Sequence, residues 1–296
     1  MCSGGSLIFG RIGDWTWETV AEACRTNVHA AHTAEGRPAY LSFYYYRVRG
    51  GKVHPHGLTF GDELQVTSRV FQLGSQSVLT LHRLAPADLA LDGAEFAPEE
   101  AYEHPHPDCL YVENYNRWIA RTRPGSNQRL AQVTPPDFQY AHLPRLPNQY
   151  SPRTAVNRAR EAGTFVVEPP ADFTVTGPVE TYEYTLDVVR DLNGAGLVYF
   201  AAYFSIFDTA LLRLWRSLGR DDKQFLQRKV IDQRVGYFGN ADPGAVFTIT
   251  VRRWCSAAHP EIELADMVMR DAVSGQLLAI TSIELESASL SLHTAT

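Results

Sequence analysis

The chain has few cysteines, and they lie far apart. None of them forms a CxxC pair, the spacing expected of a zinc site or of closely paired thiols. We therefore expect reduced thiols, without disulfide bonds, at Cys2, Cys24, Cys109 and Cys255.

The sequence also lacks a long apolar run. No stretch is long enough to span a bilayer, and Gly10, Arg11 and Asp14 interrupt the N-terminal segment before the apolar core of a signal peptide could form. This pattern predicts a soluble, cytoplasmic protein without a membrane partner.

Basic charge is not in excess. The 296 residues hold 27 Lys and Arg against 33 Asp and Glu, for a formal net charge of -6. This balance argues against a general nucleic-acid partner, although local basic patches stay compatible with it. A hydrophobic content of 45% over this length predicts one large or two medium domains.

Two catalytic signatures are missing. No GxSxG elbow of a serine hydrolase occurs. Potential metal ligands cluster in two segments where prolines alternate with them, which is typical of extended loops, and neither segment has a recognisable zinc spacing. We therefore predict no metal at His54, His56, His104, His106, Asp108 or Cys109.

A polar glycine turn at 191–196 leads directly into an apolar helix, predicted over 197–216. Apolar residues recur in it at spacings of three and four. The first amides of a helix point out of its end, so Asp191 to Gly196 are placed to hold a polarised carbonyl. Gly194 and Gly196 begin like a dinucleotide fingerprint, but Tyr199 replaces the third glycine and strands follow the helix.

The same segment also fits a purely structural role. In that interpretation the helix is part of the core, Asn193 caps it, and the glycines relieve backbone strain. The sequence predicts a buried helix in either case.

The rest of the chain predicts two similar halves. We expect a helix at 14–25 and strands at 38–49, 64–73, 75–83, 163–168, 179–190, 228–238, 245–254, 261–270 and 276–287. Residues 134–152 hold five prolines and predict an ordered crossing. The helix starts at 14 and 199 lie 185 positions apart, and Gly61 and Gly244 lie 183 apart, which suggests a duplicated unit. Each half is predicted to wrap an antiparallel sheet around one apolar helix, an α+β architecture.

Four segments of the chain resemble a known family. They are GDWTWETVAEA at 13–23, RPAYLSFYYYRVR at 37–49, PNQYSPRTAVNRAREAGTF at 147–165 and DLNGAGLVYFAAYFSIFDTALLRLW at 191–215. The chain resembles the double hot-dog bifunctional acyltransferase/decarboxylases of polyketide biosynthesis, of the leinamycin-pathway type. The resemblance implies a first hot-dog unit at 1–133, a proline-rich linker or crossing at 134–160 and a second unit at 161–296.

The family resemblance implies an enzyme without a cofactor. Such an enzyme takes methylmalonyl from coenzyme A, releases carbon dioxide and delivers propionyl to an acyl carrier protein, so its partners are an acyl-CoA and that carrier. A tyrosine on an early strand is required for transfer, and Tyr40 is the matching position. The N-terminal segment SLIFGRIGDWTW is shorter than the family's opening motif.

Tyr40 has two possible chemical roles. It is either an acyl acceptor, which requires a nearby base or positive charge, or a hydrogen-bond donor to an oxyanion. Simple alternation places Tyr40, Ser42, Tyr44, Tyr46 and Val48 on one face of the strand and Leu41, Phe43 and Tyr45 on the other. The alternative is a packed strand aromatic.

Decarboxylation of a malonyl-type thioester passes through an enolate whose oxygen must be stabilised. We expect the donors to be the Asn193 side chain and the amides of Gly194, Ala195 and Gly196. Tyr44, Tyr199 and Tyr203 are predicted to line the substrate pocket.

Two groups of basic residues are candidates for phosphate or carrier-protein contacts. The first includes Arg213, Arg216 and Arg220, and the second comprises Arg145, Arg153, Arg158 and Arg160. A solvated surface explains such groups equally well.

Other functions of a hot-dog protein remain open. A thioesterase would use an acid on or beside the central helix, for which Asp208 is the candidate, and a dehydratase would need a histidine that the second turn and helix lack. A binder of acyl chains or carrier proteins would need no catalytic residue. The two units complete each other's sheet, and a homodimer beyond that stays open.

Overall fold

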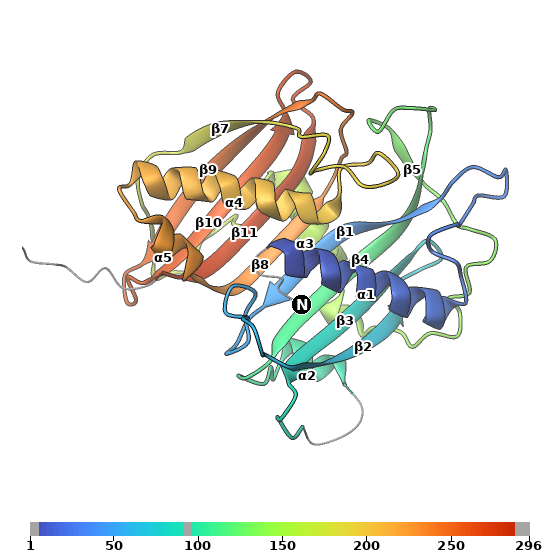
Figure 1. The fold of residues 1–296 in the computed structure, drawn as a ribbon, viewed down its shortest axis with the longest axis horizontal. Coiled ribbons are helices and arrows are strands. Elements are labelled where there is room, and N and C mark those ends of the chain that lie inside the picture. The colour runs from blue at the N-terminus through green and yellow to red at the C-terminus, as the bar shows by residue number, and fades with distance from the viewer. Residues whose placement is uncertain (1–5, 92–95, 288–296) are drawn as a thin grey trace, which may run out of the picture.

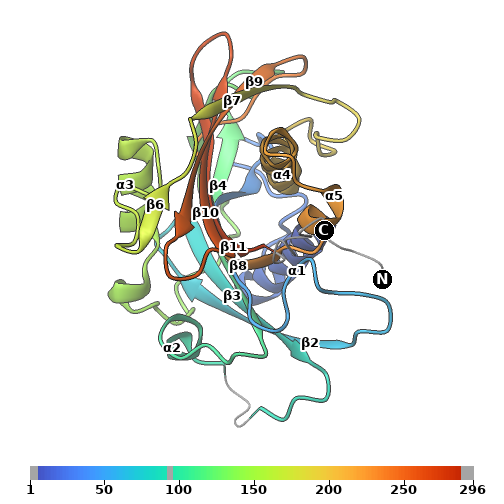
Figure 2. The ribbon, with the colours of Figure 1, turned by 90° about the vertical axis from the view of Figure 1, so that its left-hand side faces the viewer.

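The computed structural model describes residues 6–91 and 96–287. Their strands form one 11-stranded sheet, with two long helices side by side on one face and two shorter ones on the other (Figures 1 and 2).

The first half contains α1 (Ser6–Cys24), β1 (Tyr40–Arg49), β2 (Leu64–Gln72), β3 (Ser77–Pro86), α2 (Pro98–Tyr102), β4 (Leu110–Arg121) and β5 (Leu130–Gln132). A 3-10 turn (Asn148–Tyr150) and α3 (Arg153–Ala162) follow. The second half contains β6 (Phe173–Val175), β7 (Glu180–Thr185), α4 (Phe200–Ser217), α5 (Asp222–Leu226), β8 (Lys229–Tyr237), β9 (Val246–Ser256), β10 (Ile262–Asp271) and β11 (Leu277–Glu286).

The two halves share one topology. In each half a long helix precedes four strands, and the first strand pairs with the fourth, the fourth with the third and the third with the second. The sheet order is β2-β3-β4-β1-β8-β11-β10-β9-β6, so β1 and β8 meet at the centre. The predicted α+β, double hot-dog architecture is confirmed, with both half-sheets fused into one.

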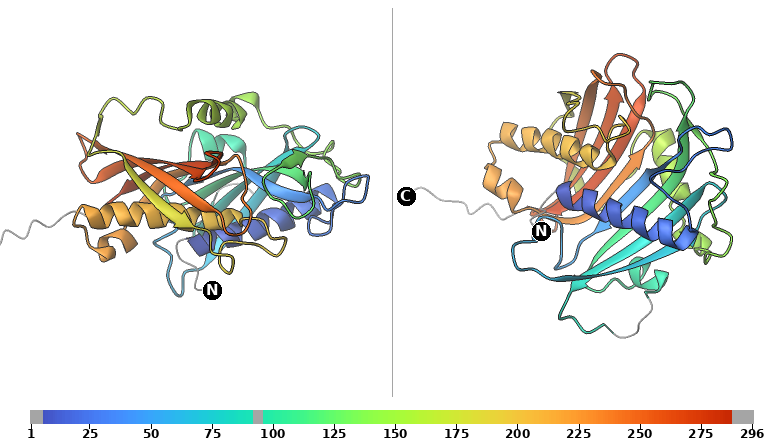
Figure 3. Two further views of the ribbon diagram at one scale, coloured as in Figure 1. Left: turned by 90° about the horizontal axis from the view of Figure 1, so that it is seen from above. Right: turned by 45° about the vertical axis from the view of Figure 1, so that its right-hand side comes forward.

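The two long helices pack against each other as well as against the sheet (Figure 3, right). Phe9 of α1 stacks on Phe204 of α4 with ring centroids 4.1 Å apart. Gly13 lets the Phe200 ring approach closely, since a Cβ at this position would lie 2.0 Å from Phe200 Cζ. Helix α4 and the N-terminal half of α1 thus share one core with β1, β3, β4 and the second half-sheet, whereas Val20 and Cys24 of α1 pack in a separate cluster.

The segment between the halves crosses the opposite face of the sheet. Figure 3 (left) shows α3 on that face, away from α1 and α4. The predicted linker at 134–160 therefore contains most of a helix, which ends at Gly163 in the left-handed region (φ 71). The strand predicted at 163–168 is wrong, because this stretch is the turn after α3.

A bulge changes the facing of β1. The register with β4 shifts between Phe43 and Tyr45, which leaves Tyr44 outside the regular pairing. Beyond the bulge Tyr46 packs in the same core as Phe43, whereas Tyr45 packs on the α3 face. The predicted alternation is therefore correct up to Phe43 and wrong for Tyr45, Tyr46 and Val48, since Val48 also packs in the core that holds Phe43.

Several other features bear on the expectations from sequence. Cys24, Cys109 and Cys255 are free thiols, and Cys2 lies outside the described residues. In the described ranges no group of three or more His, Cys, Asp or Glu side chains is arranged to hold a metal ion. None of the helices in those ranges combines the length and the apolar character needed to cross a membrane.

Candidate active site

The two central strands pair along only half of β1. Residues Tyr45–Arg49 pair with Asp232–Gly236 of β8, and the preceding segment Tyr40–Tyr44 has no β8 partner. The glycine turn before α4 and the residues after β8 fill the space between the diverging strands. This seam between the two halves holds two adjoining cavities.

The first, which we call the Tyr40 cavity, has a volume of about 400 Å³. Its walls come from α1, from the loop after it, from β1 and from the turn before α4. It is lined by Asp14, Trp17, Val28, His29, Tyr40, Leu41, Ser42, Phe43, Asn193, Gly194, Ala195, Leu197, Val198, Tyr199, Phe200 and Asn240. The structure therefore brings Tyr40 of the first half and the glycine turn of the second half into one cavity.

Arg121, the last residue of β4, connects these two parts. Its Nη1 donates to the Tyr40 hydroxyl at 3.1 Å, and its Nη2 donates to the Ala195 carbonyl at 2.5 Å. The third nitrogen, Nε, donates to Asn127 Oδ1 at 3.0 Å. A positive charge thus lies directly beside the Tyr40 oxygen, as nucleophilic use of a phenol requires.

Asn127 holds this arginine in place from a loop between β4 and β5. It is buried, and its Nδ2 donates to the Gly196 carbonyl at 2.6 Å and to the Ala241 carbonyl at 2.9 Å. The Asp242 carboxylate accepts a hydrogen bond from the backbone amide of Asn127 at 2.6 Å, which holds the loop in place. The guanidinium is therefore oriented by partners from both halves.

The glycine turn uses most of its own amides internally. Asn193 Oδ1 accepts the amides of Ala195 and Leu197, each at 3.0 Å, and the Gly196 amide donates to the Asn193 carbonyl at 2.8 Å. The predicted donor set is corrected for the amides of Ala195 and Gly196, which stabilise the turn, whereas the Asn193 Nδ2 group has no partner among the described residues and stays a predicted donor. Within the described residues the Gly194 amide has no partner, and a Cβ at Gly194 would meet nothing within 4 Å.

The turn is also separate from the helix cap. The cap of α4 is Tyr199, without a side-chain cap bond, so the helix begins at Phe200, three residues later than predicted. Asn193 therefore caps the turn and not the helix. Asn240, which follows β8, accepts the Val198 amide at 3.0 Å and ties the turn to the second half-sheet.

Asp14 is the only carboxylate among the residues that line the Tyr40 cavity. Its side chain is 43% exposed, and burial of the remainder raises its pKa above the ordinary value while Arg11 opposes that shift. Burial, with a smaller contribution from the Asp14 charge, raises the pKa of Tyr199 to about 12. Tyr199 is therefore a neutral wall residue near neutral pH.

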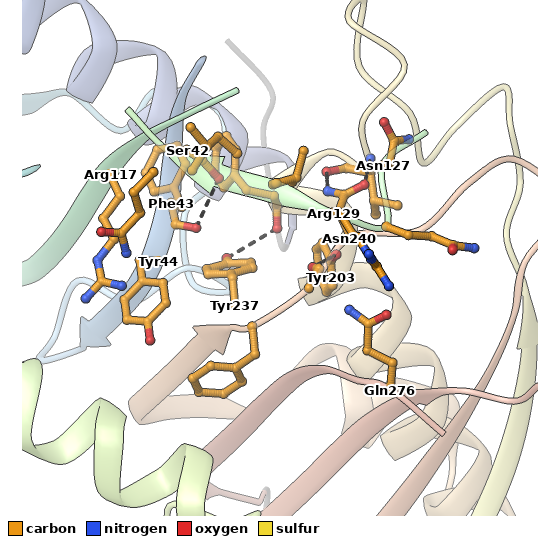
Figure 4. A pocket seen from close by; sticks show the side chains of 18 of the residues that line it. Ser42, Phe43, Tyr44, Arg117, Asn127, Arg129, Tyr203, Tyr237, Asn240 and Gln276 are labelled. Atoms are coloured by element: carbon orange, nitrogen blue, oxygen red, sulfur yellow. Dashed lines mark hydrogen bonds between the residues drawn. The ribbon is translucent and has the colours of Figure 1, made fainter. Parts of the chain in front are cut away.

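The second cavity, which we call the Tyr44 cavity, also has a volume of about 400 Å³ (Figure 4). It holds the other two predicted pocket tyrosines, Tyr44 and Tyr203. The Tyr203 hydroxyl donates to the Gly239 carbonyl at 3.1 Å, and the Arg117 guanidinium lies 3.5 Å from the Tyr44 ring centroid. The two cavities share a wall made of Ser42, Phe43, Val198, Phe200 and Asn240.

The first group of predicted phosphate ligands lies elsewhere. Arg216 forms an ion pair with Asp222 at 2.6 Å, and Arg220 forms one with Glu263. Arg213 donates to the Glu183 carbonyl at 2.8 Å. All three lie in or after the C-terminal half of α4, which is about 27 Å long. Their distance from the turn separates them from the Tyr40 cavity, and their predicted phosphate or carrier-protein contact stays a prediction.

Asp208, the candidate acid of a thioesterase, is likewise engaged. It forms an ion pair with the buried Arg228 at 2.8 Å and lines neither cavity. A water-activating acid at this site would instead have to be Asp14.

Sequence reasoning missed Arg121, Asn127 and Asn240. Arg121 ends a strand that was not predicted, and the two asparagines stand in loops with no motif around them. The one available signal was that Asn127 and Asn240 each lie beside a glycine or serine in a turn, which also describes many ordinary loops.

Comparison with known proteins gives one family and one fold. Residues 1–167 match the family model described as the LnmK N-terminal Hot Dog Fold domain. A solved structure described as an oleoyl thioesterase from Lactobacillus plantarum superposes with a TM-score of 0.58 at 11% identity, covering 96% of this chain and 89% of that one. An acyl-ACP thioesterase from Bacteroides thetaiotaomicron gives a TM-score of 0.48 at 10% identity over 95% and 89% of the two chains. The search of curated proteins returned no match.

Proposed function

The chain belongs to the LnmK N-terminal Hot Dog Fold domain family, and from that premise we propose that it is an enzyme acting on acyl thioesters. The reaction is transfer of the acyl group from a malonyl-type acyl-coenzyme A to an acyl carrier protein, with loss of carbon dioxide. The premise supports the thioester chemistry, and the residues of the Tyr40 cavity support the finer assignment.

The single observation behind this assignment is the contact between Arg121 and the Tyr40 hydroxyl in a cavity shared by both halves. A guanidinium that donates to a phenol oxygen stabilises negative charge as it develops on that oxygen. Arg121 has no carboxylate partner among the described residues, so its charge is not already neutralised. Tyr40 is therefore the best supported acyl acceptor in the cavity.

Transfer proceeds in two balanced steps. The Tyr40 oxygen attacks the thioester carbonyl carbon, the carbon–sulfur bond breaks, and coenzyme A leaves as the thiol with the phenolic proton. The carrier's thiol then attacks the tyrosyl ester, and the Tyr40 oxygen recovers a proton from that thiol. No metal or cofactor takes part in either step.

Decarboxylation uses the same cavity. When the carbon–carboxylate bond breaks, its electron pair forms an enolate whose negative charge lies on the carbonyl oxygen, and the α-carbon then takes a proton from water. The unpartnered amide of Gly194 and the unpartnered Nδ2 group of Asn193 are the available donors for that oxygen, and one such donor contributes about 3 to 4 kcal/mol of barrier lowering.

A thioesterase is the second candidate, favoured by one observation. Asp14 lies in the same cavity as Tyr40, partly exposed, and burial raises its pKa toward the range useful to a general base. In that case water replaces Tyr40 as the nucleophile, and the products are free acid and coenzyme A.

Incubation with methylmalonyl-coenzyme A, with and without a holo-carrier protein, tests these candidates. Intact-protein mass and product analysis should find an acylated protein and propionyl on the carrier. Free acid as the main product, lost in Asp14→Asn and retained in Tyr40→Phe, would replace the transferase by the thioesterase. The absence of turnover with any acyl thioester would leave a binding protein.

A further inference from the structure

The Tyr44 cavity is lined by three arginines and by no acid among the described residues. Arginines from three separate elements line it, namely Arg117 of β4, Arg129 of the β4–β5 loop and Arg160 of α3. No Asp or Glu is among its lining residues, although the chain as a whole is acidic. Figure 4 shows Arg117 and Arg129 on two sides of the cavity.

These arginines differ from those at the end of α4 in being unpaired. Arg117 donates to the Tyr115 hydroxyl at 2.9 Å and lies over Tyr44, but none of the described carboxylates pairs with it. The exposed side chains of Arg129 and Arg160 have no ion pair or hydrogen bond with any residue in 6–91 or 96–287. Their charges are therefore available to a ligand.

The position of the cavity relates these charges to the catalytic residues. It adjoins the Tyr40 cavity, because both cavities are lined by Ser42, Phe43, Val198, Phe200 and Asn240. A ligand whose reactive end reaches Tyr40 can thus carry an anionic group at a distance from it, in the Tyr44 cavity. Side-chain amides of Gln128, Gln132 and Gln276 around the same cavity add neutral donors that suit phosphate oxygens.

We propose that the Tyr44 cavity is a phosphate-ester subsite, in which Arg117, Arg129 and Arg160 bind a phosphate of the pantetheine-containing thioester. This rests on the proposed function, because it assigns the thioester end of the same ligand to the Tyr40 cavity. The phosphate has two possible sources: the one on the pantetheine arm, common to coenzyme A and a carrier protein, and those of the nucleotide, present in coenzyme A alone.

Two double variants with the same change of charge test the subsite. Arg129→Ala/Arg160→Ala removes two cavity arginines, whereas Arg123→Ala/Arg158→Ala removes two exposed arginines of the same loop and the same helix that do not line it. Binding of coenzyme A, 4′-phosphopantetheine and pantetheine is measured by calorimetry without turnover. Thermal unfolding of each variant establishes that it is folded.

The cavity variant should bind coenzyme A about tenfold or more weakly, with the control variant within about twofold of the wild type. Pantetheine, which has no phosphate, should bind all three proteins equally. An equal loss for 4′-phosphopantetheine assigns the subsite to the arm phosphate, and a loss for coenzyme A alone assigns it to the nucleotide.

Unchanged coenzyme A binding in the cavity variant, equal weakening in both double variants, or a loss that extends to pantetheine would each overturn the proposal. The result is independent of the proposed reaction. If the wild type transfers acyl groups but the cavity variant binds coenzyme A normally, the subsite fails and the function stands. If the cavity variant loses coenzyme A but no thioester is turned over, the subsite stands and the function fails.

Discussion

The guanidinium of Arg121 donates a hydrogen bond to the hydroxyl of Tyr40 across 3.1 Å. The same guanidinium is bound to the carbonyl of Ala195, which belongs to the other half of the chain. One side chain therefore sets the position of the candidate nucleophile relative to the turn that faces it. We therefore expect both the proposed chemistry and the contact between the halves to depend on this residue.

Removal of the Tyr40 hydroxyl should abolish acyl transfer and leave the fold intact. Tyr40→Phe loses the acceptor oxygen but keeps the ring that Arg121 covers at 5.5 Å. We expect no acyl-protein adduct in intact-mass spectra and a loss of transfer of at least about 10²-fold. Tyr140→Phe, at a half-buried tyrosine packed on Phe138, is the matched control. Unchanged transfer by Tyr40→Phe would show that another residue is the acyl acceptor.

Replacement of Arg121 by lysine should impair transfer more than binding. A lysine ammonium cannot hold the Tyr40 hydroxyl, the Ala195 carbonyl and Asn127 in one planar arrangement. We expect kcat for transfer to fall by about 10- to 100-fold with a much smaller change in KM. A kcat that keeps its wild-type value would limit Arg121 to a structural role.

The two glycines of the turn should respond differently to alanine. Gly196 has a φ of +70°, where an L side chain is strained, so Gly196→Ala should lower the free energy of unfolding by about 1 kcal/mol. Gly194 has open space around it and no such φ, so Gly194→Ala should change stability by less than about 0.5 kcal/mol. Urea unfolding of both variants measures the difference, and equal losses would contradict the turn geometry.

The contact between α1 and α4 should be sensitive to a single methyl group. A Cβ at Gly13 would lie 2.0 Å from Phe200 Cζ, so Gly13→Ala should destabilise by about 1 to 3 kcal/mol despite the better helix propensity of alanine. Gly10→Ala, on the same helix, meets only the end of Tyr199 at 3.0 Å and should cost less. Thermal unfolding distinguishes them, and the reverse order would be inconsistent with this packing.

Stability should fall as pH rises through the titration of a buried acid. Burial raises the pKa of Glu113 to about 7 from an ordinary 4.5, and Arg47 only partly offsets this. Between these two values the folded state retains a proton that the unfolded state has released, so stability decreases with rising pH, by on the order of 3 kcal/mol in total.

Glu113→Gln should flatten that dependence. Burial also raises the pKa of Asp266 to about 6, so the comparison is made above this value, between about pH 6 and pH 8. Burial lowers the pKa values of His54, His56 and His82, which adds an opposite slope near pH 6.5 to both proteins. Chemical unfolding at several pH values in this window should therefore show that the stability of the wild type, relative to that of the variant, decreases as pH rises. Parallel slopes would exclude Glu113 as the titrating group.

The elements of the second half were predictable because each shows a simple pattern. The apolar spacing of α4 indicated a core helix, and β8 to β11 lie within two residues of their predicted bounds. Turn glycines such as Gly244 and Gly275, both with positive φ, separate those strands. In these elements the local sequence pattern and the tertiary structure favour the same secondary structure.

The missed elements lack such patterns for physical reasons. Strand β4 is buried on both faces over most of its length, so it shows no alternation, and two of its buried side chains are the polar Asn114 and Asn116. Helix α3 buries only Val156 and Ala159, too few for an apolar stripe. The bulge at Tyr44 depends on pairing with β4, which no local residue of β1 specifies.

The same holds for the candidate site. Tyr40 and the turn were identifiable because a resemblance pointed to one and glycines to the other. Arg121 was not, because its role comes from two partners 81 and 74 residues away in the chain. Long-range contacts of this kind produce no recognisable local sequence pattern near either residue.

The pairing between β1 and β8 is short, so hydrogen exchange of part of the β1 backbone reports on binding in the seam. Because Tyr40–Tyr44 has no strand partner on its β8 side, the amide protons that point to that side are not protected by the sheet ladder. Their deuterium uptake is governed by what occupies the seam, whereas that of Tyr45–Arg49 follows the stability of the whole sheet. Deuterium uptake in β1 thus reports ligand binding in the seam at Tyr40–Tyr44, and uptake at Tyr45–Arg49 serves as the reference for global stability.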